Sequence, residues 1–94
     1  MNSKSVYKIP NGKLLKINLN YDKNTNKIKE VIITGDFFVH PEEAIELIEE
    51  KLLNVKLDKI NLFETIQSVI DENKIELIGL DAEGLTNGIL MCLK

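Results

Sequence analysis

The stretch VIITGDFFVHPEEAIELI (31–48) contains the point at which the hydrophobic pattern of the chain changes its period. Upstream of it, KLLKINLNY (13–21) alternates apolar and polar residues, which is the pattern of a half-buried strand. Downstream, EEAIELIEEKLLN (42–54) repeats its apolar residues at spacings of three and four, the helical period. A run of strands followed by a run of helices indicates an α+β fold.

Three strands are expected in the first half of the chain: SVYKIP (5–10), KLLKINLNY (13–21) and KIKEVIITG (27–35). Between the first two, Pro10-Asn11-Gly12 has the residue types of a tight turn. In the third strand, three consecutive apolar residues at 31–33 blur the alternation. This fits either a strand that is covered on both faces near its end or a β-bulge.

The second half is expected to be helical. The first helix is expected to begin at Pro41, with His40 at the N-cap, and to continue through EEAIELIEEKLLN (42–54). A short extended link follows at 75–80, with a fourth strand there as an option. The expected fold is a single α+β domain over 1–94: a three-stranded antiparallel sheet with three helices packed on one face, in the order β-β-β-α-α-(β)-α.

Two further helices carry clear capping residues. Asp58 precedes KINLFETIQSVIDEN (59–73), and Asp81 precedes AEGLTNGILMCL (82–93). The buried stripe of the earlier of these helices is expected to comprise Leu62, Phe63, Ile66, Val69 and Ile70.

The last helix contains two glycines, Gly84 and Gly88, which four-residue spacing places on one face. Each costs about 1 kcal/mol relative to alanine in a helix interior, so a compensating role is expected. Two roles are open: close packing of that face against the sheet or another helix, and a flat patch for a partner.

Composition excludes several classes of function. The chain has 12 Lys, no Arg, 15 Asp and Glu and a net charge of −3, which argues against nucleic-acid binding and against clamping of ATP phosphates by this chain alone. No apolar run approaches the ~20 residues of a membrane span, and MNSKSVYKIP (1–10) lacks a secretory h-region. We expect a cytoplasmic, unprocessed protein with no membrane partner.

The segment GDFFVHP (35–41) is expected to be a strand-to-helix corner. The residues that shape the corner are Gly35, His40 and Pro41. Asp36 is expected to accept backbone N–H bonds there, while Phe37 and Phe38 point in different directions, one toward the core.

No catalytic residue and no metal site are expected. A catalytic pair of Asp36 and His40 would lack a nucleophile, because neither Ser nor Cys occurs between residues 6 and 67. The one His and the one Cys are far apart in sequence, and the glutamates after Pro41 form the solvated face of a helix.

Three segments together resemble the C-terminal accessory domain of lipoate–protein ligases. They are PNGKLLKINLNY (10–21), KIKEVIITGDFF (27–38) with its Pro-started acidic helix, and IGLDAEGLTNGIL (78–90). The resemblance covers about residues 4–93, and the GDFF element after a β-branched strand is its most recognisable feature. It implies a stand-alone small subunit, often called the B subunit, that associates with a large catalytic subunit.

In that family the large subunit binds lipoate, ATP and Mg, forms lipoyl-AMP and passes the lipoyl group to a lysine of an acceptor protein. The resemblance implies that the small subunit binds none of these itself and is needed for adenylation but dispensable for transfer. It also implies the acceptors, the E2 component of 2-oxoacid dehydrogenases and the H protein of the glycine cleavage system.

The surface that docks on the large subunit is expected at the hairpin and the corner. The candidate residues are Tyr7, Pro10, Asn11, Gly12, Asp36, Phe37 and Phe38. Two other readings stay open: an iron–sulfur scaffold or sulfur-acceptor module, which would need a reactive Cys92, and a homo-oligomeric structural domain.

Overall fold

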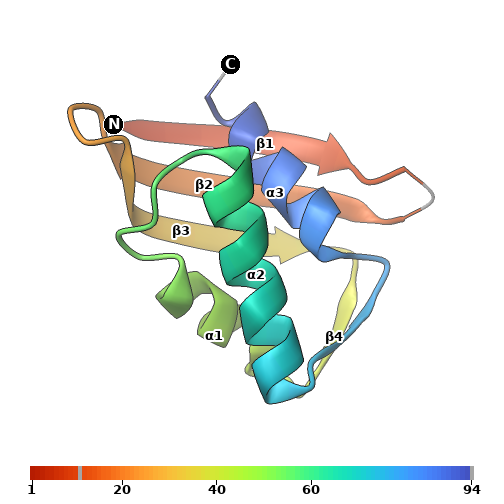
Figure 1. Ribbon diagram of the computed structural model, residues 1–94. Coiled ribbons are helices and arrows are strands. Elements are labelled where there is room, and N and C mark those ends of the chain that lie inside the picture. The colour runs from red at the N-terminus through yellow and green to blue at the C-terminus, as the bar shows by residue number, and fades with distance from the viewer. Residues whose placement is uncertain (11, 94) are drawn as a thin grey trace.

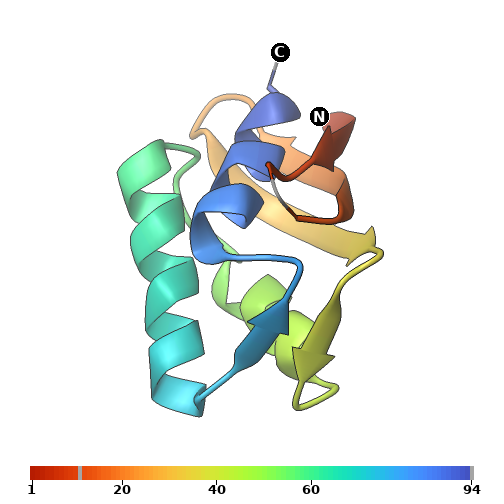
Figure 2. The same cartoon turned by 90° about the vertical axis from the view of Figure 1, so that its right-hand side faces the viewer.

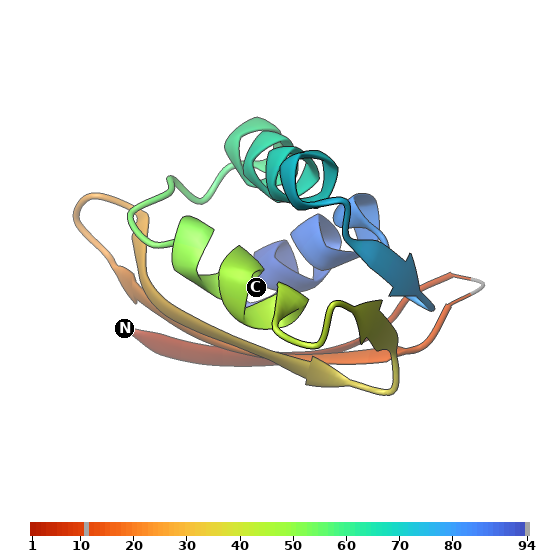
Figure 3. The same cartoon turned by 90° about the horizontal axis from the view of Figure 1, so that it is seen from below.

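The computed structural model describes residues 1–10 and 12–93, which form a three-stranded sheet with three helices on one of its faces (Figure 1). The strands are β1 (Asn2–Lys8), β2 (Leu14–Asp22), β3 (Lys27–Gly35), β4 (Phe38–His40) and β5 (Glu76–Ile78). The helices are α1 (Ala44–Lys51), α2 (Lys59–Asn73) and α3 (Ala82–Met91). Figure 3 shows the sheet edge-on with the helices all on the same side, α1 and α3 next to the sheet and α2 farther out. The expected α+β fold and order of elements are confirmed.

The main sheet is antiparallel in the order β1-β2-β3. Its register shifts where Asn20 faces Glu30 but Tyr21 faces Ile28, which leaves Lys29 as an extra residue on β3. This is a β-bulge at Lys29, before the run at 31–33, where burial alternates regularly and the pattern blurs because the exposed Ile32 is itself apolar. Ile32 is 44% exposed, so the alternative of a strand covered on both faces is wrong.

The inner face of the sheet and the helices enclose one core. Leu15, Ile17 and Leu19 project from β2 and are almost completely buried. Helices α1 and α3 pack directly on the strands, and α2 lies over both of these helices with the buried residues Leu62, Ile66 and Val69. Phe63 remains 38% exposed, so its predicted place in the buried stripe is wrong.

Helix α1 begins later than expected. It starts at Ala44, with Glu43 at the N-cap and no side-chain cap. His40 belongs instead to β4, which pairs with β5 in a separate two-stranded sheet through His40↔Glu76. The predicted N-cap at His40 and helix start at Pro41 are therefore wrong, because strand pairing with a segment distant in sequence extends the chain there. The optional fourth strand exists, but it pairs with β4 rather than with the main sheet.

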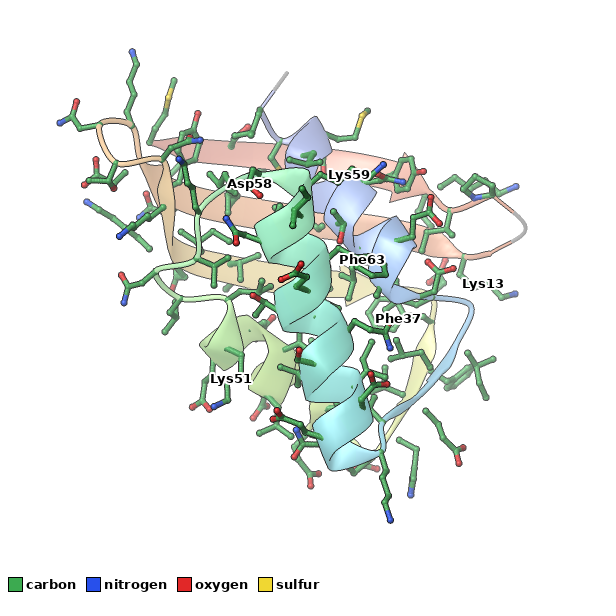
Figure 4. All side chains as sticks on the ribbon, viewed as in Figure 1. Lys13, Phe37, Lys51, Asp58, Lys59 and Phe63 are labelled. Atoms are coloured by element: carbon green, nitrogen blue, oxygen red, sulfur yellow. The ribbon has the colours of Figure 1, made fainter. Side chains whose placement is uncertain are left out.

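The other caps agree with expectation. The carboxylate of Asp58 accepts a hydrogen bond from the N–H of Asn61 (2.8 Å), at the start of α2 in Figure 4. The carboxylate of Asp81 accepts one from the N–H of Gly84 (2.6 Å). Both bonds satisfy N–H groups that a helix start would leave unpaired. Within the described residues, no helix is long and apolar enough to cross a membrane.

The two glycines of α3 serve close packing on the sheet. A Cβ atom on Gly88 would lie 2.7 Å from Leu15 Cδ2, and one on Gly84 would lie 3.0 Å from Ile9 Cδ1. The hydroxyl of Ser5 also donates to the carbonyl of Gly88 (2.8 Å). Both glycines are buried, so the packing role is confirmed.

Glu49 of α1 lies against the outer edge of β3, where its carboxylate accepts a hydrogen bond from the N–H of Ile33 (2.8 Å). Burial raises the pKa of this carboxyl above its usual value, although the bond from Ile33 acts in the opposite direction. Stability from this group is therefore greatest where the carboxyl is protonated in both states, and it is lost as pH rises through the raised pKa.

Glu49→Gln is expected to raise the free energy of unfolding at pH 7, because the amide oxygen can still accept from Ile33 without a charge being buried. The gain should shrink as the pH is lowered to about 4, near the usual pKa of a glutamate. Urea unfolding at both pH values measures this, with exposed Glu50→Gln as the charge-matched control. An equal response of the two variants at both pH values would contradict the assignment.

Candidate docking site

The hairpin between β1 and β2 is anchored to the segment that precedes α3. Within it, Gly12 N–H donates to the carbonyl of Ile9 (2.8 Å) and Ile9 N–H donates to that of Lys13 (3.2 Å). Lys13 N–H in turn donates to the carbonyl of Gly79 (3.0 Å). The hairpin thus has a fixed position next to the β5–α3 link. Asn11, one of the predicted docking residues, lies outside the described residues.

The corner after β3 lies beside the same hairpin. Asp36 N–H donates to the carbonyl of Leu14 (3.1 Å), at the start of β2. A Cβ on Gly35 would overlap that carbonyl oxygen and lie 2.9 Å from the ring of Phe37, so close approach of two backbones requires glycine. The exposed Asp36 makes its hydrogen bond here through the backbone N–H, and the expected acceptor role of its carboxylate is not observed in the described residues.

The two phenylalanines diverge as expected. Phe37 is half-buried and packs against the core, at the end of the molecule where Lys13 also lies (Figure 4). Phe38 is 72% exposed and stands opposite Ile78, which is 64% exposed, in the β4–β5 pair. Directly opposite residues of an antiparallel pair share one face, so these two form an exposed apolar pair.

Several of the predicted residues therefore gather at one end of the molecule, which Figure 2 presents to the viewer. We call this the hairpin-and-corner surface, and it comprises Pro10, Gly12, Lys13, Asp36, Phe38 and Ile78. Sequence reasoning missed Ile78, because a three-residue strand is too short to show a period.

Other predicted residues lie at the border of this surface or beyond it. Tyr7 lines a shallow hollow with Pro10, Asp81 and Asn87, against the start of α3. His40 is the last residue of β4, where it pairs with Glu76, and Pro41 comes directly after the strand. The residues predicted to shape the corner thus lie at both ends of β4, with Gly35 before the strand and His40 and Pro41 at its other end.

The thiol of Cys92 is in an unreactive setting. It is 3% exposed, and burial raises its pKa, with a hydrogen bond to the hydroxyl of Ser5 acting in the opposite direction. A buried thiol with a raised pKa is a poor nucleophile and a poor metal ligand, which disfavours the sulfur-transfer reading. Within residues 1–10 and 12–93, no three His, Cys, Asp or Glu side chains are arranged to hold a metal ion.

Substitution of each phenylalanine should show which of the two rings contributes to the stability of the core. Phe38→Ser is expected to change the free energy of unfolding by no more than about 0.5 kcal/mol, because the ring is exposed. Phe37→Ala should lower it by about 2 kcal/mol, since the ring packs against the core. Chemical denaturation measures both, and a larger loss for Phe38→Ser than for Phe37→Ala would reverse the assignment.

Comparisons with known proteins identify the family of the chain. Residues 7–88 match the family described as bacterial lipoate protein ligase C-terminus. A 45-residue segment is 40% identical to Lipoate-protein ligase A subunit 2 of Thermoplasma acidophilum, and this match spans 48% of the chain and 48% of that relative.

A solved structure is similar over nearly the whole chain. It belongs to an archaeal lipoylation system from Thermoplasma acidophilum, described as a bi-partite lipoate protein ligase and its E2 lipoyl domain. The TM-score is 0.79 at 26% identity, over 95% of this chain and 94% of that one. The chain therefore belongs to the family of bacterial lipoate protein ligase C-termini, as its sequence predicted.

Proposed function

We propose that this chain is the non-catalytic accessory subunit of a two-component lipoate–protein ligase, which docks on a separate catalytic subunit and is needed for lipoate adenylation. The observation that carries the proposal is the mutual coverage of 95% and 94% with a chain from a bi-partite ligase system. The two chains therefore share one fold along almost the whole length that is compared.

The chemistry belongs to the catalytic subunit in this proposal. That subunit binds lipoate, ATP and Mg, and the lipoate carboxylate attacks the α-phosphorus of ATP to give lipoyl-AMP and pyrophosphate. The amine of a lysine on an acceptor, an E2 lipoyl domain or a glycine cleavage H protein, then attacks the lipoyl carbonyl, which forms an amide and releases AMP. The proposal keeps the cytoplasmic location expected from the sequence.

The role of the accessory subunit is to shape and cover the adenylation site. Lipoyl-AMP is a mixed anhydride, and exclusion of water from its surroundings suppresses wasteful hydrolysis. Docking can also order mobile loops of the catalytic subunit and align its two substrates, an effect worth about 100-fold in rate when reacting atoms would otherwise be misplaced by about 1 Å.

The hairpin-and-corner surface is the proposed contact for docking. Phe38 and Ile78 offer an exposed apolar centre, and Lys13 and Asp36 lie exposed near it. An apolar centre with charged residues around it is the usual composition of a protein–protein interface. The hydrogen bond from Lys13 to Gly79 holds the hairpin beside this centre before any partner arrives.

Single-turnover formation of lipoyl-AMP tests the proposal. A catalytic ligase subunit from the same organism should form lipoyl-AMP about 100-fold faster when this chain is added. Phe38→Ser should need a higher chain concentration for the same rate, whereas Ile60→Ser, which alters an equally exposed apolar residue of α2, should behave as the unsubstituted chain. Equal rates with and without the chain would reject the proposed function.

A further inference from the structure

In the residues that the structure describes, β1 forms one edge of the main sheet and has backbone groups without a partner. At the two ends of β1, Ile9 N–H donates to the carbonyl of Lys13 (3.2 Å) and Tyr21 N–H donates to that of Met1 (3.0 Å). In the continuous register between them, the alternation of an antiparallel ladder directs the backbone groups of odd-numbered residues toward β2. Those of the even-numbered residues point away from the sheet. We call this the β1 edge, and it comprises Asn2, Lys4, Val6 and Lys8.

The opposite edge of the sheet is covered by the chain itself. On β3, Ile28 N–H donates to the carbonyl of Val55 (3.0 Å) and the carbonyl of Ile28 accepts from Asn54 N–H (2.8 Å). Further along, the Glu49 carboxylate occupies the N–H of Ile33. No such backbone hydrogen bond reaches the β1 edge from the part of the chain that the structure describes. An uncovered edge is a template for another strand.

The side chains of the β1 edge indicate the charge of that strand. Lys4 and Lys8 are exposed on the outer face of the sheet, and Val6 between them is 64% exposed. Their neighbours on β2 are Asn18 opposite Lys4 and Leu14 opposite Lys8, so neither lysine faces an acidic residue across the strands. Opposite charges across neighbouring strands stabilise their pairing.

We propose that the β1 edge accepts an extended segment of the catalytic subunit as a fourth strand of the sheet, with acidic side chains beside Lys4 and Lys8. This inference rests on the proposed function, which supplies the catalytic subunit as the partner. The main-chain hydrogen bonds supply affinity, and the lysines select the sequence and register of the incoming segment. The β1 edge continues into the hairpin at Ile9 and Pro10, so the segment and the hairpin-and-corner surface form one continuous contact.

The lysines disfavour a second copy of this chain as the occupant. Antiparallel pairing of two β1 edges brings the Lys4 and Lys8 side chains of both copies together on one face, either directly opposite or diagonally adjacent. Like charges in such positions destabilise the pair. The same lysines that reject self-association attract an acidic strand, so one feature of the sequence serves both purposes.

Amide hydrogen exchange tests the proposal directly, because it measures the protection of each β1 amide. In the free chain, the amides of Ser3, Ser5 and Tyr7 should be protected and those of Lys4, Val6 and Lys8 should exchange rapidly. On saturation with the catalytic subunit, the even-numbered amides should gain protection of at least about tenfold, as expected for one added hydrogen bond each. Unchanged exchange of these amides in a saturated complex would overturn the inference.

Two variants test the same contact by affinity. Val6→Pro removes one outward N–H and no bond to β2, in an edge position where proline is tolerated, and should weaken binding about tenfold. Lys4→Glu with Lys8→Glu should weaken it by a similar factor or more, with a loss that shrinks as salt is raised. Lys27→Glu with Lys29→Glu is the charge-matched control on β3 and should bind as the unsubstituted chain.

The outcomes distinguish this inference from the proposed function. If the unsubstituted chain binds and accelerates adenylation while Val6→Pro binds equally well, the β1 edge is not the contact and the proposed function stands. If the lysine variant weakens binding but Val6→Pro does not, the partner covers the outer face without adding a strand, which overturns the inference. If the unsubstituted chain neither binds nor accelerates, the proposed function itself fails.

Discussion

Leu15→Ala is expected to lower the free energy of unfolding by about 3 kcal/mol, because this side chain is fully buried on β2 beneath α3. The second half of the experiment adds Gly88→Ala. In the single variant Gly88→Ala, the added methyl group would lie 2.7 Å from Leu15 Cδ2 and overpack the contact between α3 and β2. This should lower the free energy of unfolding by about 1–3 kcal/mol, which exceeds the gain in helix propensity.

Together, the two substitutions should partly compensate, since the methyl group on residue 88 enters space that the shortened side chain at 15 has left. A double-mutant cycle by chemical denaturation should give a favourable coupling of about 1 kcal/mol or more. The control cycle pairs Gly88→Ala with Ile28→Ala, which is equally buried but lies at the far end of β3 and should be additive. Additivity in both cycles would contradict the packing of α3 on β2.

Gly35→Val should cost about 3 kcal/mol in unfolding free energy and should disturb the corner itself. The added Cβ overlaps the carbonyl oxygen of Leu14, which is a backbone atom, so no change of rotamer relieves the clash. Relief requires β2 and the corner to separate, with loss of the hydrogen bond from Asp36 N–H.

Gly79→Ala provides the control for Gly35→Val. Gly79 has a φ of 82°, so alanine there costs about 1–2 kcal/mol, but its Cβ would meet the flexible side chain of Lys13 and not a backbone atom. Denaturation should therefore rank Gly35→Val as the more harmful change, and the Asp36 amide should exchange faster in that variant alone. The reverse ranking would show that close backbone approach is not what position 35 requires.

The elements that sequence alone predicted are those set by local chemistry. The period of β2 and the capping carboxylates of Asp58 and Asp81 involve residues within a few positions of one another, and each appears as expected. The strand at Phe38–His40 was missed because its partner, Glu76–Ile78, lies far along the chain. Pro41 favoured a helix start locally, and this non-local pairing prevailed over it.

The candidate site shows the same division. The divergence of Phe37 and Phe38 follows from the geometry of extended backbone, so the motif alone predicted it. The exposed partner of Phe38, Ile78, follows only from the β4–β5 register. The β1 edge was also invisible, because the weak alternation of SVYKIP gives no sign of which strand is outermost or of what covers the opposite edge.

The most direct test of a role in adenylation adds preformed lipoyl-AMP to the reaction. A catalytic ligase subunit and an apo lipoyl domain are given either lipoate with ATP or preformed lipoyl-AMP, each with and without this chain, and lipoylation of the acceptor lysine is followed. If the chain acts in adenylation, it should raise the rate about 100-fold with lipoate and ATP and should leave the rate with lipoyl-AMP unchanged. An equal stimulation of both reactions, or of neither, would contradict a role in adenylation.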